Sequence, residues 1–311
     1  MSAASCHFPM TSAAVAINHV TKRFGSHVAV DDLCLEVPAG TIYGFIGPNG
    51  SGKTTTLRMI MRILHPDQGT IRVLGEEVFG AANDRVGYLP EERGLYKQMK
   101  VHDLLRFYAE LKGCRETKAQ IQRWLERMGL AEWGQKKVEA LSKGMAQKVQ
   151  FIATVIAKPQ LLLLDEPFSG LDPVNAEVLR AAILDQRREG TTVIFSTHDM
   201  AVAEKMCDFI FMIYQGKKVL DGTLSAIQQR FGQDTVRVRW EGKGQDLPLI
   251  PGVVKLTDFG QLHELRLEPG ADPQHVLASL MAHGRILHFE VTHPTLHDVF
   301  VRIAGAETHV T

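Results

Sequence analysis

The sequence has no net charge, because Lys+Arg and Asp+Glu each total 35 among its 311 residues. A chain without a basic excess has no overall attraction for nucleic acid or acidic lipid, although local patches remain open. Its four cysteines include no CxxC pair, so we expect neither a disulfide framework nor a structural zinc site. No run of about 18 apolar residues occurs, and the first 16 residues lack the features of a signal peptide. Any membrane role therefore depends on a partner chain.

The composition that is present, 45% hydrophobic and 23% charged, is typical of a folded protein of about two domains. Alternating apolar and polar residues near the start indicate antiparallel strands, and later strands alternate with helices as in a parallel sheet. A helical block interrupts this pattern, with a candidate capping box formed by Thr117 and Gln120. The expected parts are an N-terminal tail at 1–14, an α/β domain at 15–224 with a helical part at about 97–158, and a small α+β domain at 225–311.

The run Gly47-Pro-Asn-Gly-Ser-Gly-Lys-Thr54 follows a short apolar strand and precedes a helix-compatible segment. Small residues let successive backbone N–H groups close around a phosphate at a helix N-terminus. Lys53 would add positive charge toward the β- and γ-phosphates, and the Thr54 hydroxyl would reach Mg²⁺. A coincidental glycine turn is the alternative, and the flanking strand and helix disfavour it. The predicted nucleotide-binding residues of this loop are Gly47, Asn49, Gly50, Ser51, Gly52, Lys53, Thr54 and Thr55.

Four leucines, residues 161–164, form a buried strand that ends in Asp165 and Glu166. Ligands of open α/β sheets bind at the carboxyl ends of the strands, so both carboxylates are expected near the phosphates. Asp165 is the expected second holder of Mg²⁺, and Glu166 is placed to accept a proton from the attacking water. Acidic residues that only make a strand end soluble are the alternative, which the phosphate loop disfavours.

Base recognition has one candidate residue. The sequence has no Asn-Lys-x-Asp motif for reading guanine, so stacking rather than edge recognition is expected. Phe24, in the run Thr21-Lys-Arg-Phe-Gly25, is the candidate stacking face. A core aromatic at a strand end is the competing interpretation.

Taken in order, these motifs resemble those of the ATP-binding subunits of ABC transporters, over about residues 15–222. Leu141-Ser-Lys-Gly-Met145 is similar to the signature motif of that family, Ser169-Gly-Leu-Asp172 to its D-loop, and His198 to its switch histidine. The resemblance implies a P-loop NTPase fold of the α/β class, with a RecA-like core, an antiparallel β subdomain and a helical subdomain. It also implies an ATPase that uses ATP and Mg²⁺, with Glu166 and His198 as catalytic residues.

The resemblance further implies a head-to-tail pair of subunits with two nucleotides at the interface. Ser142 is a natural N-cap and Gly144 leaves the N–H groups of the first turn open, so this helix end can bind an anion. In the family that anion is the γ-phosphate held by the other subunit. The expected partners are a second copy of the chain and an integral membrane permease, with no nucleic acid, at the cytoplasmic face of the membrane. The residues expected to act in trans are Ser142, Lys143, Gly144, Met145 and Asp172.

Two departures from the family pattern stand out. Glu91 occupies the position of the usual glutamine-loop residue, where it could still ligate Mg²⁺ but adds negative charge beside the phosphates. Lys143 and Met145 replace a glycine and a glutamine of the signature. We expect modest rather than abolished hydrolysis. These features are similar to those of bacterial sodium-efflux and ABC-2 exporter ATPases, and they do not identify the cargo.

Two other functions remain open at this stage. A soluble ABC-type ATPase that acts on ribosomes or DNA is disfavoured by the neutral charge, the single cassette and the absence of sustained heptads. A degenerate cassette that only binds nucleotide is disfavoured because Lys53, Asp165, Glu166 and His198 are all present.

Overall fold

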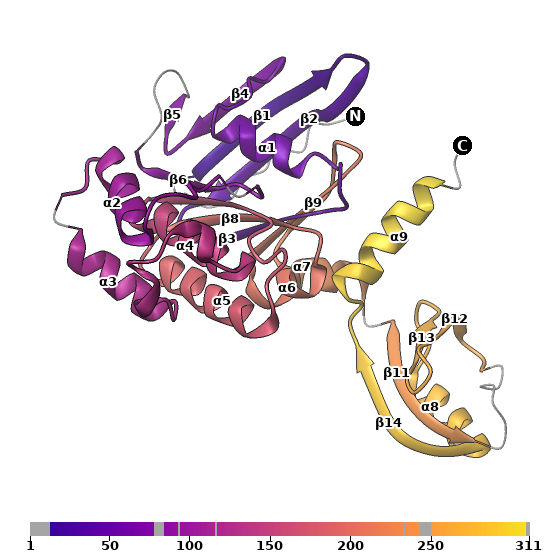
Figure 1. Cartoon of the computed structure of the whole chain (residues 1–311). Coiled ribbons are helices and arrows are strands. Elements are labelled where there is room, and N and C mark those ends of the chain that lie inside the picture. Colours follow the sequence, from indigo (N-terminus) through magenta and orange to yellow (C-terminus); the bar gives the residue numbers. More distant parts are fainter. Residues whose placement is uncertain are drawn as a thin grey trace. The chain divides into compact units, whose positions relative to one another are not determined.

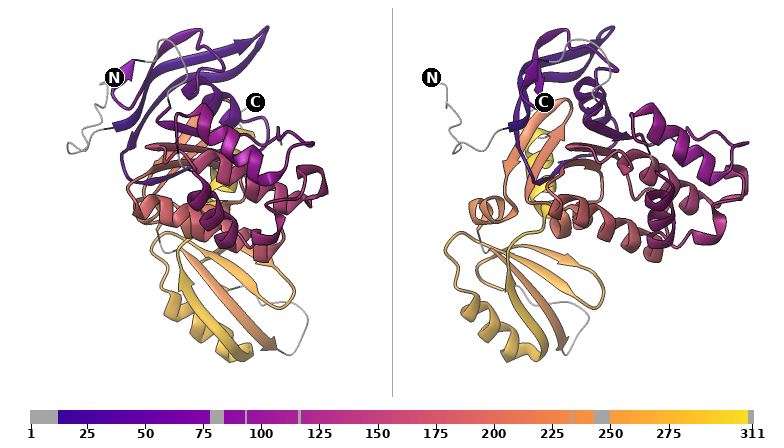
Figure 2. Two further views of the ribbon diagram at one scale, coloured as in Figure 1. Left: turned by 60° about the vertical axis from the view of Figure 1, so that its left-hand side comes forward. Right: turned by 90° about the vertical axis from the view of Figure 1, so that its left-hand side faces the viewer.

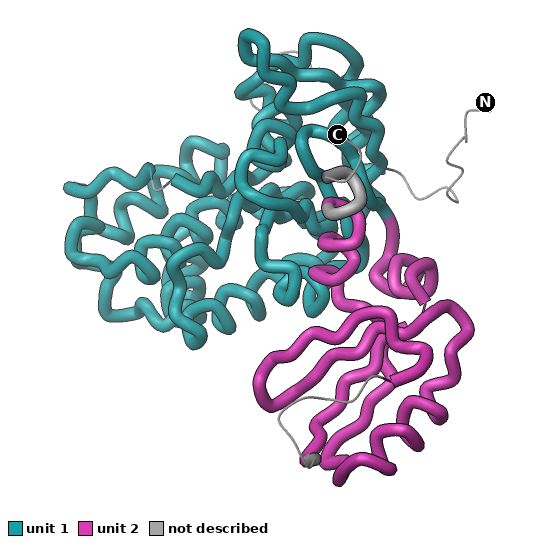
Figure 3. The backbone as a smooth tube through the Cα atoms, turned by 90° about the vertical axis from the view of Figure 1, so that its right-hand side faces the viewer, with its two compact units in different colours: residues 1–221 teal, residues 222–311 magenta. Residues whose placement is uncertain are grey.

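The computed structural model describes residues 13–77, 84–92, 94–115, 117–232, 234–242 and 250–308. Positions 1–12 of the expected N-terminal tail lie outside the described residues, and the first strand begins at Ala13. The chain divides into two compact units, residues 1–221 and residues 222–311, shown in different colours in Figure 3. Each unit has its own hydrophobic core and is described here by itself.

A six-stranded sheet forms the centre of the first unit, in the order β10-β9-β3-β8-β7-β6 (Figure 1). Strand β3 pairs in parallel with β8 and β9, and β7 pairs in parallel with β6 and β8. The carboxyl ends of these strands therefore meet at one edge of the sheet. The strands are β3 (Ile42–Ile46), β6 (Val86–Leu89), β7 (Leu161–Asp165), β8 (Thr192–Thr197), β9 (Phe209–Tyr214) and β10 (Lys217–Gly222).

The two faces of this sheet carry separate cores because side chains alternate along each strand. In β7, Leu161 and Leu163 join one core, whereas Leu162 and Leu164 join the other. The first core is closed by α1 (Lys53–Ile60) and by an antiparallel sheet of order β2-β1-β4-β5. Figure 2 shows this sheet as a layer on one side of the unit. Its strands are β1 (Ala13–Phe24), β2 (His27–Pro38), β4 (Gln68–Val73) and β5 (Glu76–Glu77).

Helices cover the opposite face and form the second core of the first unit. They include the predicted helical block, to which short 3₁₀ turns at Ala131–Trp133 and Val138–Ala140 belong. Asp172 and Asp199 cap two of the helices through their side-chain oxygens, as a short acceptor at an N-cap does. The helices are α2 (Val101–Leu111), α3 (Lys118–Arg127), α4 (Lys143–Val155), α5 (Pro173–Arg188) and α6 (Met200–Met206). The predicted α/β class with an antiparallel and a helical part is confirmed.

The capping box predicted at the start of α3 is wrong. Thr117 makes no side-chain cap bond. The Gln120 amide instead donates to the carbonyl oxygen of Ile156, at 2.7 Å. The partner lies 36 residues further along the chain, so a tertiary hydrogen bond has replaced the local one that the sequence pattern indicated.

The second unit is a small α+β domain, as the sequence predicts. Its four strands form a sheet of order β12-β13-β11-β14, and α8 packs on it through Val276 and Leu280. Thr223 caps the helix that opens the unit. The elements are α7 (Leu224–Phe231), β11 (Thr235–Gly242), β12 (Val253–Asp258), β13 (His263–Leu267), α8 (Pro273–His283), β14 (Gly284–Thr292) and α9 (Leu296–Thr308).

Candidate functional site

The glycine loop joins the carboxyl end of β3 to the first turn of α1. Gly47 has φ +158°, and a Cβ there would lie 2.2 Å from the carbonyl oxygen of Ile213. Gly52 has φ +111°, and a Cβ there would lie 2.5 Å from the carbonyl oxygen of Ala29. A side chain is excluded at both positions by space and by backbone conformation. The loop therefore stays open only because these residues are glycine.

Lys53 is buried and turns back over this loop. Its ammonium group donates to the carbonyl oxygens of Gly47, at 2.7 Å, and Pro48, at 3.0 Å. Burial lowers the pKa of Lys53, and the charge of the Glu166 carboxylate acts in the opposite direction. The ammonium lies 3.9 Å from Glu166 Oε1, so a concentrated positive charge faces the end of β7.

Oxygen ligands converge between α1 and the end of β7. The Thr54 hydroxyl donates to Asp165 Oδ1 at 3.0 Å, and the Ser196 hydroxyl also donates to Oδ1. The other carboxylate oxygen, Asp165 Oδ2, is buried and has no hydrogen-bond partner among the described residues. A buried unpaired carboxylate oxygen is costly, and hydroxyl and carboxylate oxygens are the ligands that Mg²⁺ prefers. This donor set therefore fits a magnesium ion.

Glu166 adopts a left-handed backbone conformation, with φ +47°. Such a conformation costs a non-glycine residue about 1–3 kcal/mol and needs support from its surroundings. The support comes from Ser196, whose hydroxyl and carbonyl oxygens both accept from the Glu166 N–H. His198 Nδ1 lies 3.0 Å from Glu166 Oε1, in hydrogen-bond contact. The Glu166 side chain is 10% exposed and that of His198 60%, so the carboxylate faces inward beneath a solvent-facing imidazole.

A cavity of about 410 Å³ lies over the glycine loop. It brings together Phe24 from the end of β1, Glu91 from beyond β6, and Glu166. Phe24 is 46% exposed, which excludes the core-aromatic interpretation. The other predicted residues in its lining are Asn49, Gly50, Gly52, Lys53, Thr54 and Thr55.

Three further residues near the cavity were missed by the sequence analysis. His27 and Ala29 line it from β2, directly after the turn that follows Phe24. Ser196 holds Asp165 and Glu166 in place, and it stands two residues before His198, which the sequence analysis had named. The hairpin around Phe24 and the run before His198 were the available signals.

Comparisons with known proteins agree with this arrangement. The ABC transporter family model matches residues 30–169. An ABC transporter ATP-binding protein of Bacillus subtilis strain 168, YhaQ, is 41% identical over 294 residues, covering 94% of this chain and 99% of the relative. The chain belongs to the ATP-binding subunits of ABC transporters. This confirms the family that the motifs indicated, and with it ATP as the ligand and ATP hydrolysis as the general activity.

Other ABC transporter subunits extend the comparison to both units. The daunorubicin resistance ATP-binding protein DrrA3 of Streptomyces coeruleorubidus is 32% identical, covering 97% of this chain and 99% of the relative. A model of the C-terminal domain of DrrA1-3-like ATP-binding proteins matches residues 222–304. A solved ATP-binding subunit of an ABC transporter aligns with a TM-score of 0.66 at 28% identity, covering 70% of this chain and 93% of that one. The ABC-type P-loop NTPase fold is thereby confirmed.

ATP-binding subunits of ABC transporters work with membrane permeases, and this chain is a subunit of that kind. Among the described residues, no helix is both long enough and apolar enough to cross a bilayer.

The signature residues of this ABC subunit do not line the cavity of their own chain. Ser142 caps α4 by accepting from the Met145 N–H at 3.2 Å. Ser142 and Lys143 are exposed, whereas Gly144 is buried against Leu171, where a Cβ would make ordinary van der Waals contact. Asp172 caps α5 through the N–H groups of residues 174 and 175. The exposed end of α4 is thus free to face another molecule.

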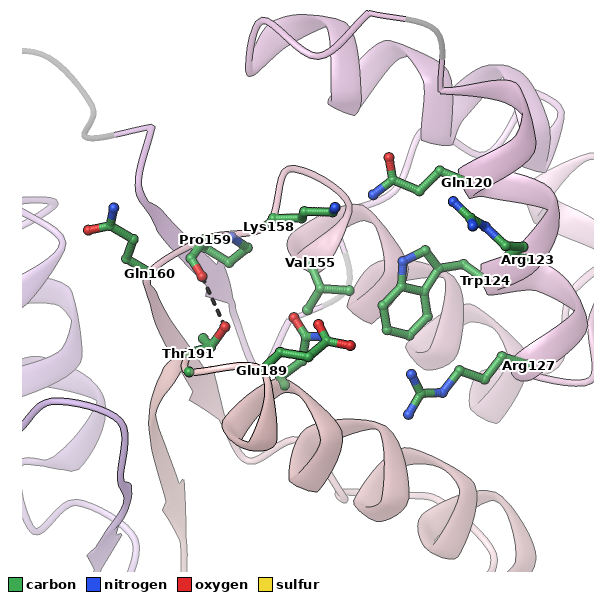
Figure 4. A pocket seen from close by; sticks show the side chains of 12 residues that line it. Gln120, Arg123, Trp124, Arg127, Val155, Lys158, Pro159, Gln160, Glu189 and Thr191 are labelled. Atoms are coloured by element: carbon green, nitrogen blue, oxygen red, sulfur yellow. Dashed lines mark hydrogen bonds between the residues drawn. The ribbon is translucent and has the colours of Figure 1, made fainter.

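A second cavity of the ABC domain, of about 680 Å³, is shown in Figure 4. It lies between α3 and the turns that precede β7 and β8, at the edge of the sheet opposite to the glycine loop. The Arg127 guanidinium lies 5.0 Å from the centre of the Trp124 ring and forms an ion pair with Asp185. No residue of the glycine loop lines this cavity, so it is separate from the nucleotide site.

Proposed function

We propose that the protein is the Mg²⁺-dependent ATPase of an ABC exporter and that it acts as a head-to-tail homodimer. The observation that carries this proposal is the cavity that joins the glycine loop, Phe24, Glu91 and Glu166 in one chain. Charge, an aromatic face and two carboxylates lie there around a space suited to a nucleotide. The signature residues lie outside that lining, which supports a site completed by a second copy.

Nucleotide binding follows from the loop. The loop between Gly47 and Lys53 would offer backbone N–H groups to the phosphates, and the Lys53 ammonium would exchange its two carbonyl acceptors for phosphate oxygens. Phe24 offers an exposed ring for stacking on the base. Since Lys22 lies 5.6 Å from that ring, a cation also stands beside the stacking face.

Magnesium would be held by Thr54 and Asp165, with Glu91 nearby in the same cavity. Asp165 Oδ2 is the buried oxygen that lacks a protein partner. When bound, the ion would neutralise charge on the phosphates and so lower the cost of approach by a nucleophile. Ser196 would keep the Asp165 carboxylate in position through its hydroxyl.

Hydrolysis is assigned to Glu166 and His198. The Glu166 carboxylate can accept a proton from the attacking water, and its supported backbone aims it into the cavity. His198 donates one ring N–H to that carboxylate, which orients both groups. The exposed remainder of the imidazole is available to a phosphate oxygen.

The second subunit would contribute the start of α4. The Ser142 side chain and the open first turn of that helix suit a γ-phosphate bound by the partner, and the Lys143 side chain adds a positive charge. Met145 provides the N–H that fixes Ser142. Asp172, as the cap of α5, would hold the D-loop at the same interface. ATP that binds the closed pair more tightly than the open pair provides the free energy that a permease can use.

Export and location are proposed from relatives. The daunorubicin resistance protein DrrA3 and a Nod factor export ATP-binding protein of Burkholderia lata, each 32% identical over nearly the whole chain, carry export or resistance in their names. We therefore place this subunit at the cytoplasmic face of the membrane, where ATP is available, beneath a permease that moves its substrate outward.

Affinity purification tests this function. Tagged Glu166→Gln chain is extracted with detergent from membranes in the presence of ATP and Mg²⁺, and the proteins that co-purify are identified by mass spectrometry. We expect a polytopic membrane protein in stoichiometric amount. Recovery of ribosomal proteins, nucleic acid or no membrane protein would contradict the proposal.

Glu91→Gln tests the unusual carboxylate of the cavity. Its negative charge acts on Lys53, so its removal should raise the affinity for ATP in EDTA by about two- to fivefold at low salt. Glu92→Gln is the matched control, since it makes the same charge change one residue along the chain, outside the cavity lining. The ATP dissociation constants are measured by nucleotide titration. Equal effects of the two substitutions would show that the Glu91 charge acts on bound ATP no more than that of Glu92.

A further inference from the structure

Helix α4 carries a buried glutamine beside the strained end of β7. Gln147 is 2% exposed, and its amide donates to the carbonyl oxygen of Pro167 at 3.2 Å. Pro167 directly follows Glu166, whose backbone has φ +47°. The glutamine thus holds the chain immediately after the strained residue, whereas Ser196 holds the N–H of that residue itself.

A second glutamine of the same helix holds the other acidic segment of the cavity. Gln150 is 6% exposed, and its amide donates to the carbonyl oxygen of Glu92 at 3.2 Å. Glu92 directly follows Glu91, which lines the nucleotide cavity. Because residues three apart share one side of a helix, Gln147 and Gln150 reach both segments from one side of α4.

We propose that Gln147 and Gln150 are positioning residues for the two carboxylates of the nucleotide cavity. Gln147 sets the place of Glu166 and Gln150 that of Glu91, each through the peptide carbonyl of the following residue. This proposal rests on the proposed function, because it takes Glu166 as the base and Glu91 as a neighbour of the phosphates.

Packing alone does not account for the amide at position 150. Its Oε1 atom is buried without a hydrogen-bond partner among the described residues. A methionine of nearly the same length would fill that space without burying an unpaired oxygen. The amide is therefore a cost to stability at this position, and its N–H bond to the Glu92 carbonyl is the gain that offsets it.

Both segments lie just beyond the ends of their strands, where the ladder of the sheet no longer fixes the carbonyl groups that the glutamines bind. The described residues between β6 and α2 form neither a helix nor a ladder, apart from one isolated bridge at Lys100. Glu166 directly follows β7, which ends at Asp165, and holds an unfavourable backbone conformation. Displacement of a reacting group by about 1 Å can cost about a hundredfold in rate, so small shifts of either segment should be visible in turnover.

The test compares Gln147→Met and Gln150→Met with Gln120→Met in the full-length chain. Gln120 is a matched control, since its amide donates to the Ile156 carbonyl at the far end of the same helix. The measurements are kcat, the dissociation constant of ATP in EDTA, and the melting temperature. The three readouts separate a displaced carboxylate from a lost nucleotide site and from a loosened fold.

We expect Gln147→Met to lower kcat by about ten- to a hundredfold, and Gln150→Met by about three- to tenfold. Both should keep ATP affinity in EDTA within about threefold of wild type, because neither glutamine lines the nucleotide cavity. Gln150→Met should melt at the same temperature as wild type or higher, since it removes a buried unpaired oxygen.

Two results would overturn the inference. One is a loss of kcat in either variant no greater than that of Gln120→Met. The other is a fall in melting temperature that accounts for the whole loss of activity. Glu166→Gln is assayed alongside to separate the proposed function from the positioning role. If this variant hydrolyses ATP like wild type, the proposed function itself has failed. If it is inactive while Gln147→Met retains wild-type kcat, only the positioning role is wrong.

Discussion

Glu166→Gln is expected to lower the rate of ATP hydrolysis by about a hundredfold or more, the usual range for loss of a general base. The amide has nearly the shape of the carboxylate but cannot accept a proton from water. The backbone support of this residue comes from Ser196 through main-chain and hydroxyl contacts, and these survive the substitution. ATP should therefore still bind, and the closed dimer should accumulate because hydrolysis no longer opens it.

Phosphate release measures the rate in this experiment, and size-exclusion chromatography with ATP measures the dimer. Glu126→Gln is the control, because Glu126 is an exposed carboxylate of α3 whose Oε1 accepts a hydrogen bond from the Gln122 amide, away from the cavity lining. Wild-type turnover in Glu166→Gln would reject Glu166 as the base. A variant that neither hydrolyses nor binds ATP would instead point to a collapsed site.

Lys53→Ala is expected to weaken ATP binding by about a hundredfold or more, since truncation of one partner in a buried charge pair costs about 2–5 kcal/mol. The Lys53 ammonium is the buried cation that faces the phosphate position, with Gly47 and Pro48 as its present acceptors. Stability should change little. Burial lowers the pKa of this lysine, so the buried ammonium carries a desolvation cost that the substitution removes.

Nucleotide titration in the presence of Mg²⁺ measures this loss, with Lys136→Ala as an exposed control of the same chemistry. The control should bind ATP like wild type. If Lys53→Ala kept an ATP affinity within a few-fold of wild type, the glycine loop would not be the phosphate site. The proposed function would then be wrong.

The motifs that identify the family are local, and for that reason they could be read before the structure was known. A glycine loop between a strand and a helix needs only the residues from 47 to 54, with glycines at fixed positions before a lysine and a threonine. The acidic pair follows its strand directly, and the N-cap Ser142 precedes its helix directly. The comparisons confirmed the family and the fold, whereas the roles of the individual site residues stay predictions.

Contacts between distant segments could not be read in this way. Ser196 meets Glu166 across 30 residues, and Gln150 meets Glu92 across 58. Thr117 and Gln120 show the same effect. The sequence pattern predicted a local capping bond between them, but in the packed structure the Gln120 amide donates to the Ile156 carbonyl instead. A buried polar group takes whichever partner the packing brings near, and sequence spacing does not reveal that partner.

Residue order thus predicts which chemistry the chain carries: a phosphate loop, a hydroxyl suited to a metal ion, an acidic strand end and a capped signature helix. It does so because backbone conformation and helix capping depend on neighbours a few residues away. The folded chain determines how these groups meet. Examples are the left-handed backbone at Glu166, the contribution of β2 to the cavity beside Phe24, and the contacts of the two glutamines of α4. Those features depend on sheet order and helix packing, which are set by burial of apolar surface across the whole first unit.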